Sequence, residues 1–226
     1  TDYLGFEINE GEFKVMSLSS FGKPIYEKEL KKMFDINNFT INMDYFEFHK
    51  SPSKSFSKKL CEVFGEPYLN INEEANFNKY ADIASSTQLI LEHTMKNLIQ
   101  KAIHLSGKRK VVLTGGVALN CKMIHSLSKQ SIFEEMIVPP SPGDSGSAIG
   151  AANFAFLEKS KTKTLNFSNI FLGPKKNFIN KKEIKDNFFS KINLTNDFII
   201  DTVTKLINGE IIASYYGSNE VGPRSL

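Results

Sequence analysis

The residues best placed to do chemistry are two adjacent glycines that follow a short run of strand-forming residues. The segment 111–120 reads VVLTGGVALN, so a strand pattern runs into a hydroxyl, then Gly115 and Gly116, then a helix-like stretch. Such a turn exposes backbone N–H groups and the positive end of a helix dipole, which suit a phosphate. Glycines also let a ligand approach the backbone closely. The alternative is that the glycines only let strand and helix pack together.

A second chemical candidate, Asp144, follows the next apolar run along the chain. Residues 136–138 predict a strand, and the prolines that follow it exclude both strand and helix. Asp144 then lies in a loop rich in glycine and serine, before a helix predicted over 147–157. Ligands of open α/β sheets bind at the carboxyl ends of strands, where a carboxylate can hold a metal or a ribose hydroxyl. The alternative is that Asp144 caps the helix.

The elements that must position these groups form two consecutive strand–loop–helix units, which predict an α/β fold. A long helix over residues 77–106 precedes them, because apolar residues recur there at three- and four-residue steps and Gly107 provides a stop. None of the four histidines has a partner four residues away, so no pair shares a helix face for a metal. We interpret His93 and His104 as structural, and His49 as a surface or partly buried side chain.

The segments on either side carry weaker signals. Residues 4–8 and 12–18 suggest a hairpin with a turn at Glu10 and Gly11, although 13–18 also fits a helix. A loop is expected at 19–26, followed by short helices at 26–34 and 56–64, with a strand or hairpin over 39–49 between them. Beyond the Asp144 loop we expect a linker, a helix over 198–207 and a strand over 210–216.

Composition narrows the class of protein. The chain has 226 residues and 41% apolar content, which is enough for one large domain or two small ones. A net charge of +3 argues against a dedicated nucleic-acid binder. Two distant cysteines, Cys61 and Cys121, argue against a disulfide scaffold or a cysteine zinc site. With no leader and no apolar run of membrane-spanning length, we expect a soluble cytoplasmic protein.

Two segments together resemble a known family. LTGGVALNCKM and IVPPSPGDSGSAIGAA are similar to the nucleotide-site segments of the O-carbamoyltransferases related to nodulation protein NodU and to the antibiotic carbamoyltransferases. SLSSFGKPIY, YADIASSTQ, IFLGP and the final GSNEVGPRSL also resemble segments of that family. The resemblance implies an actin-like ATPase fold (ASKHA, TsaD-like) over residues 1–160, a linker at 161–169, and the start of a YrdC-like α/β domain at 170–226.

The resemblance also implies a reaction and its site. The family uses ATP to transfer a carbamoyl group from carbamoyl phosphate, through a carbamoyl-adenylate, to a hydroxyl of a sugar or natural product. The nucleotide phosphates would lie against Gly115, Gly116 and Asn120, in a site whose second loop is shaped by Gly143 and Gly146. Asp144 would bind a divalent metal (Fe²⁺ or Mg²⁺/Mn²⁺). The carbamoyl-phosphate site would include two residues near the end of the chain, Glu220 and Arg224.

The family's HxxxH metal pair and the rest of its second domain have no counterpart in this sequence. We therefore expect an internal segment of a longer enzyme that does not turn over by itself. Its partners would be carbamoyl phosphate and a hydroxyl-bearing small molecule, without nucleic acid or membrane; enzymes of this kind often form homodimers. The alternatives are a non-catalytic nucleotide-binding module, or another actin-like ATPase such as a threonylcarbamoyltransferase relative.

Overall fold

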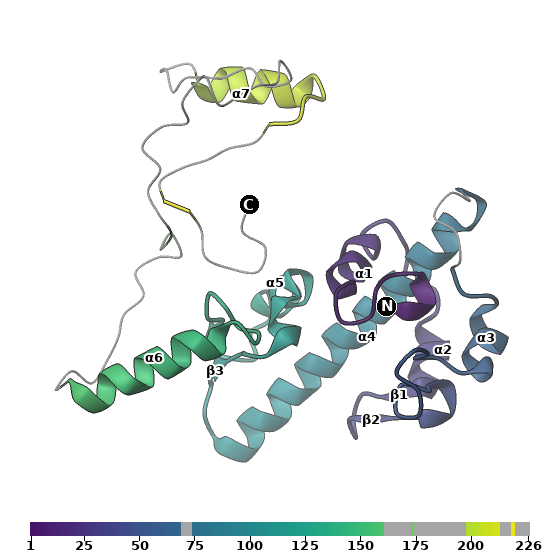
Figure 1. Ribbon diagram of the computed structural model, residues 1–226, viewed down its shortest axis with the longest axis horizontal. Helices are drawn as coiled ribbons and strands as arrows, with labels where there is room; N and C mark the ends of the chain where they lie inside the picture. The colour runs from purple at the N-terminus through teal and green to yellow at the C-terminus, as the bar shows by residue number, and fades with distance from the viewer. Residues whose placement is uncertain (69–73, 161–172, 174–197, 213–217, 220–226) are drawn as a thin grey trace. The chain divides into compact units, whose positions relative to one another are not determined.

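The computed structural model describes residues 1–68, 74–160, 173, 198–212 and 218–219 (Figure 1). The chain divides into two units, Thr1–Asp144 and Ser145–Leu226. The regular structure of the described residues consists of helices and two small sheets, which is compatible with the predicted α/β class. The actin-like and YrdC-like folds stay predictions.

One long helix, α4 (Glu74–Ser106), organises the first unit. It has 33 residues, so it is about 50 Å long. The helix predicted over 77–106 is confirmed, and it begins three residues earlier. Ala81 and Ala84 are fully buried on it, so neighbouring segments approach its backbone closely. It ends just before Gly107, whose φ of 66° is the left-handed conformation that glycine adopts readily after a helix.

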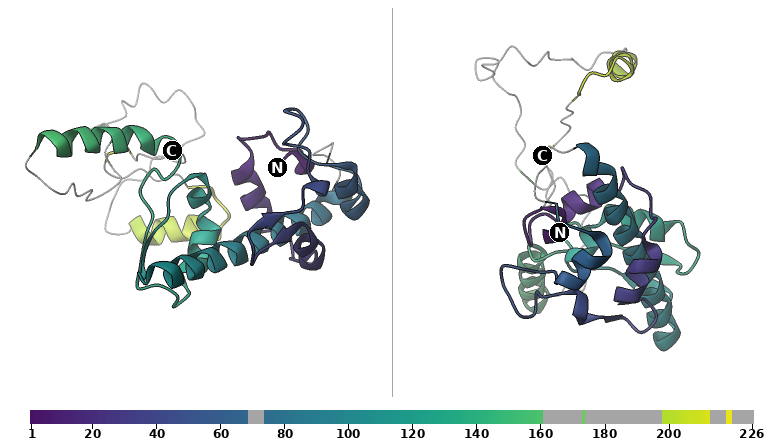
Figure 2. Two further views of the ribbon diagram at one scale, coloured as in Figure 1. Left: turned by 90° about the horizontal axis from the view of Figure 1, so that it is seen from below. Right: turned by 90° about the vertical axis from the view of Figure 1, so that its right-hand side faces the viewer.

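Short N-terminal elements pack along the first half of α4 (Figures 1 and 2). They are η1 (Asp2–Leu4), α1 (Glu12–Leu18), α2 (Glu27–Met33) and α3 (Lys58–Phe64). They bury an apolar core made of Tyr3, Leu4, Leu30, Met33, Tyr45, Leu60, Phe64, Tyr80, Ile83, Ala84 and Ile90. The short helices predicted over 26–34 and 56–64 are confirmed as α2 and α3.

The structure decides between the two alternatives for residues 4–18 and corrects the expectation for 39–49. The suggested hairpin does not form, and the helical alternative over 13–18 is confirmed as α1, because Val15 and Leu18 pack on the core at helical spacing and the Glu12 carboxylate accepts from Asn9 N–H at 3.1 Å. Of the strand or hairpin expected over 39–49, Phe46 makes an isolated antiparallel bridge to Phe56, and only β2 (Thr40–Ile41) forms a strand, pairing antiparallel with β1 (Phe34–Asp35). It stops because Asn42 Oδ1 accepts from Asp44 N–H at 3.1 Å and starts the 3-10 turn η2 (Met43–Tyr45).

The second half of α4 supports the predicted strand–loop–helix units. β3 (Lys110–Val112) leads through η3 (Gly116–Leu119) into α5 (Cys121–Ser128), and β4 (Glu135–Ile137) then returns parallel to β3, with Val111 opposite Met136. Apolar side chains of α4, α5 and the two strands form a second core around Ile99, Met123 and Leu127. Both predicted strands are therefore confirmed, each displaced by about one residue.

The described part of the second unit contains α6 (Gly146–Lys159) and α7 (Phe198–Ile207). Both confirm predicted helices. The predicted linker at 161–169 and most of the strand expected over 210–216 lie outside the described residues, so the domain boundaries stay a prediction. No helix in the described part of the chain combines the length and the apolar character needed to cross a membrane.

Candidate functional site

The predicted phosphate turn lies directly after β3. Gly115 has φ 93° and ψ 166°, a conformation essentially restricted to glycine. A Cβ added to Gly115 or to Gly116 would meet no atom within 4 Å. Close packing of strand on helix therefore does not require these glycines. The backbone conformation requires Gly115, and Gly116 leaves open space beside the main chain.

The loops that follow β3 and β4 are bonded to each other. The Pro142 carbonyl accepts hydrogen bonds from Gly115 N–H at 2.7 Å and from the Thr114 hydroxyl at 3.0 Å. A Cβ on Gly143 would lie 3.4 Å from Leu119 Cδ1, so Gly143 also lies against the turn. The loops at the two strand ends therefore meet. The sequence analysis missed the role of Thr114, although a hydroxyl directly before a glycine pair is a recognisable signal.

Asp144 follows Gly143 and is exposed. The N-cap position of α6 belongs to Ser145, so Asp144 does not occupy it, and the predicted loop residue Gly146 is the first residue of that helix. Within the described residues, no group of three His, Cys, Asp or Glu side chains is placed to hold a metal ion. One exposed carboxylate is compatible with a proposed Mg²⁺ site, because that ion is usually held by one or two carboxylates together with substrate phosphates and water.

Asn120 lies between η3 and α5 and caps α5. Its Oδ1 accepts from Met123 N–H at 2.9 Å. Its side-chain amide also pairs with that of Gln88, because Asn120 Nδ2 donates to Gln88 Oε1 at 2.8 Å and Gln88 Nε2 donates to Asn120 Oδ1 at 3.1 Å. The predicted turn is thereby attached to α4.

The segments SLSSFGKPIY and YADIASSTQ, far apart in the sequence, are in contact. A Cβ on Gly22 would collide with the α4 backbone at Ala81 and Asp82. Lys23 N–H donates to Asp82 Oδ1 at 2.6 Å, and Tyr26 N–H donates to Ser86 Oγ at 3.0 Å. The Lys23 side chain is exposed, so this residue acts through its backbone.

The same loop also contacts the start of α5. Lys122 Nζ donates to Ser19 Oγ at 2.8 Å, and that hydroxyl donates to Met16 O at 2.6 Å. Ser19 is buried, so the contact fixes the ammonium group against the loop. Three of the sequence segments singled out above therefore meet around α4 and α5.

Glu220 and Arg224 lie outside the described residues, and their predicted role stays a prediction.

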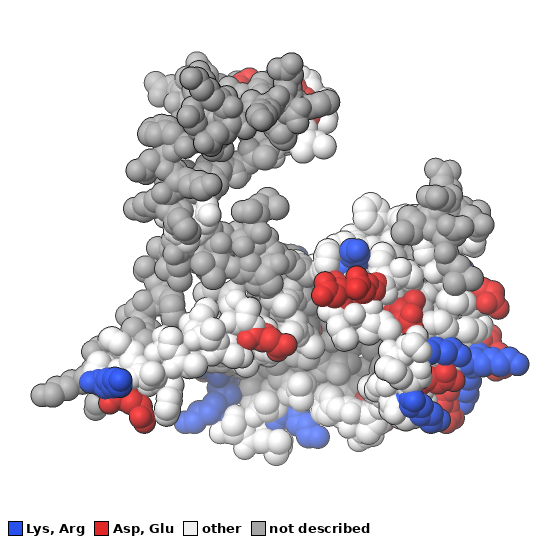
Figure 3. Space-filling model, in the orientation of Figure 1, with Lys and Arg blue, Asp and Glu red and all other residues white. Residues whose placement is uncertain are grey.

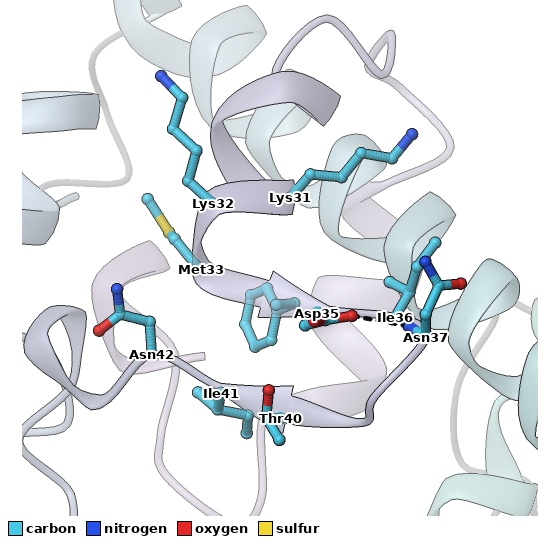
Figure 4. Close-up of a pocket in the computed structure, with 10 residues that line it drawn as sticks. Lys31, Lys32, Met33, Asp35, Ile36, Asn37, Thr40, Ile41 and Asn42 are labelled. Atoms are coloured by element: carbon cyan, nitrogen blue, oxygen red, sulfur yellow. Dashed lines mark hydrogen bonds between the residues drawn. The ribbon is translucent and has the colours of Figure 1, made fainter.

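A cavity of about 550 Å³ lies elsewhere in the first unit, between the end of α2 and the β1–β2 hairpin (Figure 4). None of the predicted site residues lines it, and Lys31 on its wall is paired with Glu27 at 2.6 Å. Acidic and basic side chains are interspersed over the described residues on the face seen in Figure 3. The described residues on that face therefore form no broad basic surface of the kind typical of nucleic-acid binding.

Comparison with known proteins identifies the same family as the sequence segments described above. A family model described as carbamoyltransferase N-terminus matches residues 1–153. An uncharacterized protein of Synechocystis sp. is 29% identical over 241 residues, covering 100% of this chain and 38% of that protein. Nodulation protein NolO of Bradyrhizobium diazoefficiens is 25% identical over 232 residues, covering 99% of this chain and 40% of that protein.

Nodulation protein U of Sinorhizobium fredii is 30% identical over 132 residues, covering 57% of this chain and 23% of that protein. The chain thus spans about two fifths of the length of the first two relatives, which match it throughout.

Proposed function

Because this chain belongs to the carbamoyltransferase N-terminus family, we propose that it forms part of the nucleotide site of an ATP-dependent O-carbamoyltransferase. The reaction would transfer the carbamoyl group of carbamoyl phosphate, through a carbamoyl-adenylate, to a hydroxyl of a sugar or natural product. One observation carries the proposal: the open turn at Gly115 and Gly116 is bonded directly to the loop that ends in Asp144.

The turn's free main-chain donors define where a phosphate would bind. Gly115 N–H is already committed to the Pro142 carbonyl, so it holds the two loops together rather than a ligand. The amides of Gly116 and Val117 have no acceptor among the described residues. Because Gly116 has no side chain that could block these amides, a phosphoryl oxygen would find two adjacent donors at close range.

Asp144 would bind the divalent metal that accompanies the nucleotide. Such a metal neutralises phosphate charge and polarises the carbonyl that is attacked. The chain's own contribution is the exposed carboxylate, held near the turn by Gly143 and by the bonds to Pro142. The remaining ligands in this proposal are phosphate oxygens, water and groups beyond the described residues.

The rest of the reaction belongs, in this proposal, to a polypeptide of the relatives' length. Residues 1–160 would form part of a TsaD-like, actin-like domain, and residues 170–226 would begin a YrdC-like domain. Glu220 and Arg224 would bind carbamoyl phosphate, because the guanidinium fork of arginine matches phosphate oxygens bidentately.

The metal provides a test of this assignment. ATP affinity should be measured by calorimetry with Mg²⁺ and with EDTA, for the unsubstituted chain, Asp144→Ala and the control Glu158→Ala. Glu158 is an exposed carboxylate on α6. We expect Mg²⁺ to strengthen ATP binding about tenfold in the unsubstituted chain and in the control, since a charge-assisted contact is typically worth about 1.5–3 kcal/mol. Asp144→Ala should lose that increment. An equal increment in all three proteins would contradict the metal assignment.

A further inference from the structure

A polarised chain of hydrogen bonds runs through Asn120 and into α4. It begins at Met123 N–H, passes through the side-chain amides of Asn120 and Gln88, and ends on Glu92, whose Oε1 accepts from Gln88 Nε2 at 2.8 Å. Gln88 is only 6% exposed, and its amide makes three hydrogen bonds. The two ends fix the direction of the chain, because a backbone N–H can only donate and Glu92 Oε1 accepts.

The direction of the chain determines what Asn120 can offer to a ligand. Both acceptor positions of Asn120 Oδ1 are used, by Met123 N–H and by Gln88 Nε2. One hydrogen of Asn120 Nδ2 is used by Gln88 Oε1, and the second has no partner in the described part of the chain. Without Gln88, Asn120 Oδ1 would still accept from Met123 N–H but could offer its second acceptor position to a ligand, whereas this Asn120 presents an N–H alone.

We propose that Gln88 is a positioning residue of the nucleotide site: through its amide pair with Asn120 it restricts Asn120 to donating a hydrogen bond to an acceptor oxygen of the ligand, such as a phosphoryl oxygen. This inference rests on the proposed function for the identity of the ligand. A ligand group that donates a hydrogen bond would find no acceptor on Asn120. The amide pair also links the position of α4 to ligand binding at the turn.

Three substitutions separate the parts of this arrangement. Gln88→Met keeps the volume and removes the pair. Asn120→Asp keeps an effective helix N-cap and removes the donor. Gln100→Met is the matched control, because Gln100 is exposed on the same helix. We expect Gln88→Met and Asn120→Asp each to weaken Mg²⁺–ATP binding about tenfold, which is the scale of one hydrogen bond to a charged group. The control should leave the affinity unchanged.

The double variant tests positioning directly. If Gln88 acts through Asn120, then Gln88→Met combined with Asn120→Asp should bind ATP no more weakly than Asn120→Asp alone. Gln88→Glu provides a rescue, because a protonated carboxyl has one donor and one acceptor, which are the two groups that the pair with Asn120 uses. Its ATP affinity relative to the unsubstituted chain should rise as the pH falls from 8 to 5. Additive losses, or a relative affinity independent of pH, would overturn the proposal.

Hydrogen exchange of the Asn120 side-chain amide, measured by NMR without ligand, separates this inference from the proposed function. The paired Nδ2 hydrogen should exchange slowly in the unsubstituted chain and quickly in Gln88→Met. Fast exchange in both would overturn the positioning role. Failure of the unsubstituted chain to bind ATP, with slow exchange intact, would contradict the nucleotide assignment while leaving the amide pair established.

Discussion

At the scale of single residues, three glycines show three different requirements. Gly115 is fixed by its backbone conformation, Gly116 leaves space open to solvent, and Gly22 lies against the main chain of α4. The sequence predicted the first two positions as a turn. It could not reveal the third, because the close approach of Gly22 to Ala81 depends on how a loop docks on a helix about sixty residues away.

Gly22→Ala should destabilise the chain. The added methyl group would overlap the backbone of α4, and overpacking of this kind typically costs about 1–3 kcal/mol. Urea unfolding should therefore show a lower midpoint for Gly22→Ala. Gly116→Ala is the matched control, because its methyl group meets no atom within 4 Å. Equal midpoints for the two variants would show that the loop does not dock on α4 as described.

At the scale of elements, the sequence predicted the long helix well because its apolar periodicity is sustained, and the two parallel strands because glycine and proline mark where each short apolar run ends. It was less certain where neither signal was present. The pattern of residues 12–18 fits both a strand and a helix. The segment forms a helix because that conformation packs its apolar side chains on α4. The amide pair of Gln88 and Asn120 joins groups 32 residues apart, and no local pattern indicates such a contact.

Tyr3 links the end of α3 to the N-terminal segment and provides a test by pH. Its hydroxyl donates to Gly65 O at 2.9 Å and to Glu66 O at 3.2 Å, and burial raises its pKa above the ordinary value of 10.0. The unfolded chain therefore releases the Tyr3 proton first. The stability that Tyr3 contributes is complete below about pH 10 and is lost as the pH rises above it.

Tyr3→Phe should consequently flatten the fall in unfolding free energy between pH 9 and about 11, as measured by urea titration across that range. The control is Tyr26→Phe, since the Tyr26 hydroxyl has no hydrogen-bond partner among the described residues. Tyr26 bonds to Ser86 Oγ through its backbone N–H, which the substitution keeps. A pH dependence that Tyr3→Phe leaves unchanged would contradict the description of the Tyr3 environment.

At the scale of the whole molecule, the parallel pair β3–β4 has a core on one face and little on the other. Val112 and Ile137 lie opposite each other and are 64% and 49% exposed. Parallel sheets are ordinarily covered on both faces. We propose that further polypeptide covers this face in proteins of the relatives' length, since those relatives extend well beyond the match.

Val112→Lys combined with Ile137→Lys should leave the melting temperature of this chain nearly unchanged, because substitutions of exposed residues usually change stability by no more than about 0.5 kcal/mol. The same variant should bind less of a fluorescent hydrophobic dye. Met136→Lys is the comparison, because Met136 packs into the second core and should lower the melting temperature markedly. A loss of stability in the double variant as large as that of Met136→Lys would show that the face is already covered.

The most direct measurement is the ATP affinity of Gly116→Val, compared by calorimetry with the unsubstituted chain and with Gly150→Val. Both glycines have open space where a side chain would be added, so neither valine disturbs close packing, but only Gly116 lies in the turn. We predict that Gly116→Val weakens Mg²⁺–ATP binding about a hundredfold, because a bulky side chain blocks two main-chain donors to a charged ligand. Gly150→Val should bind as the unsubstituted chain does. Equal affinities in all three proteins would contradict the assignment of the turn as the nucleotide site.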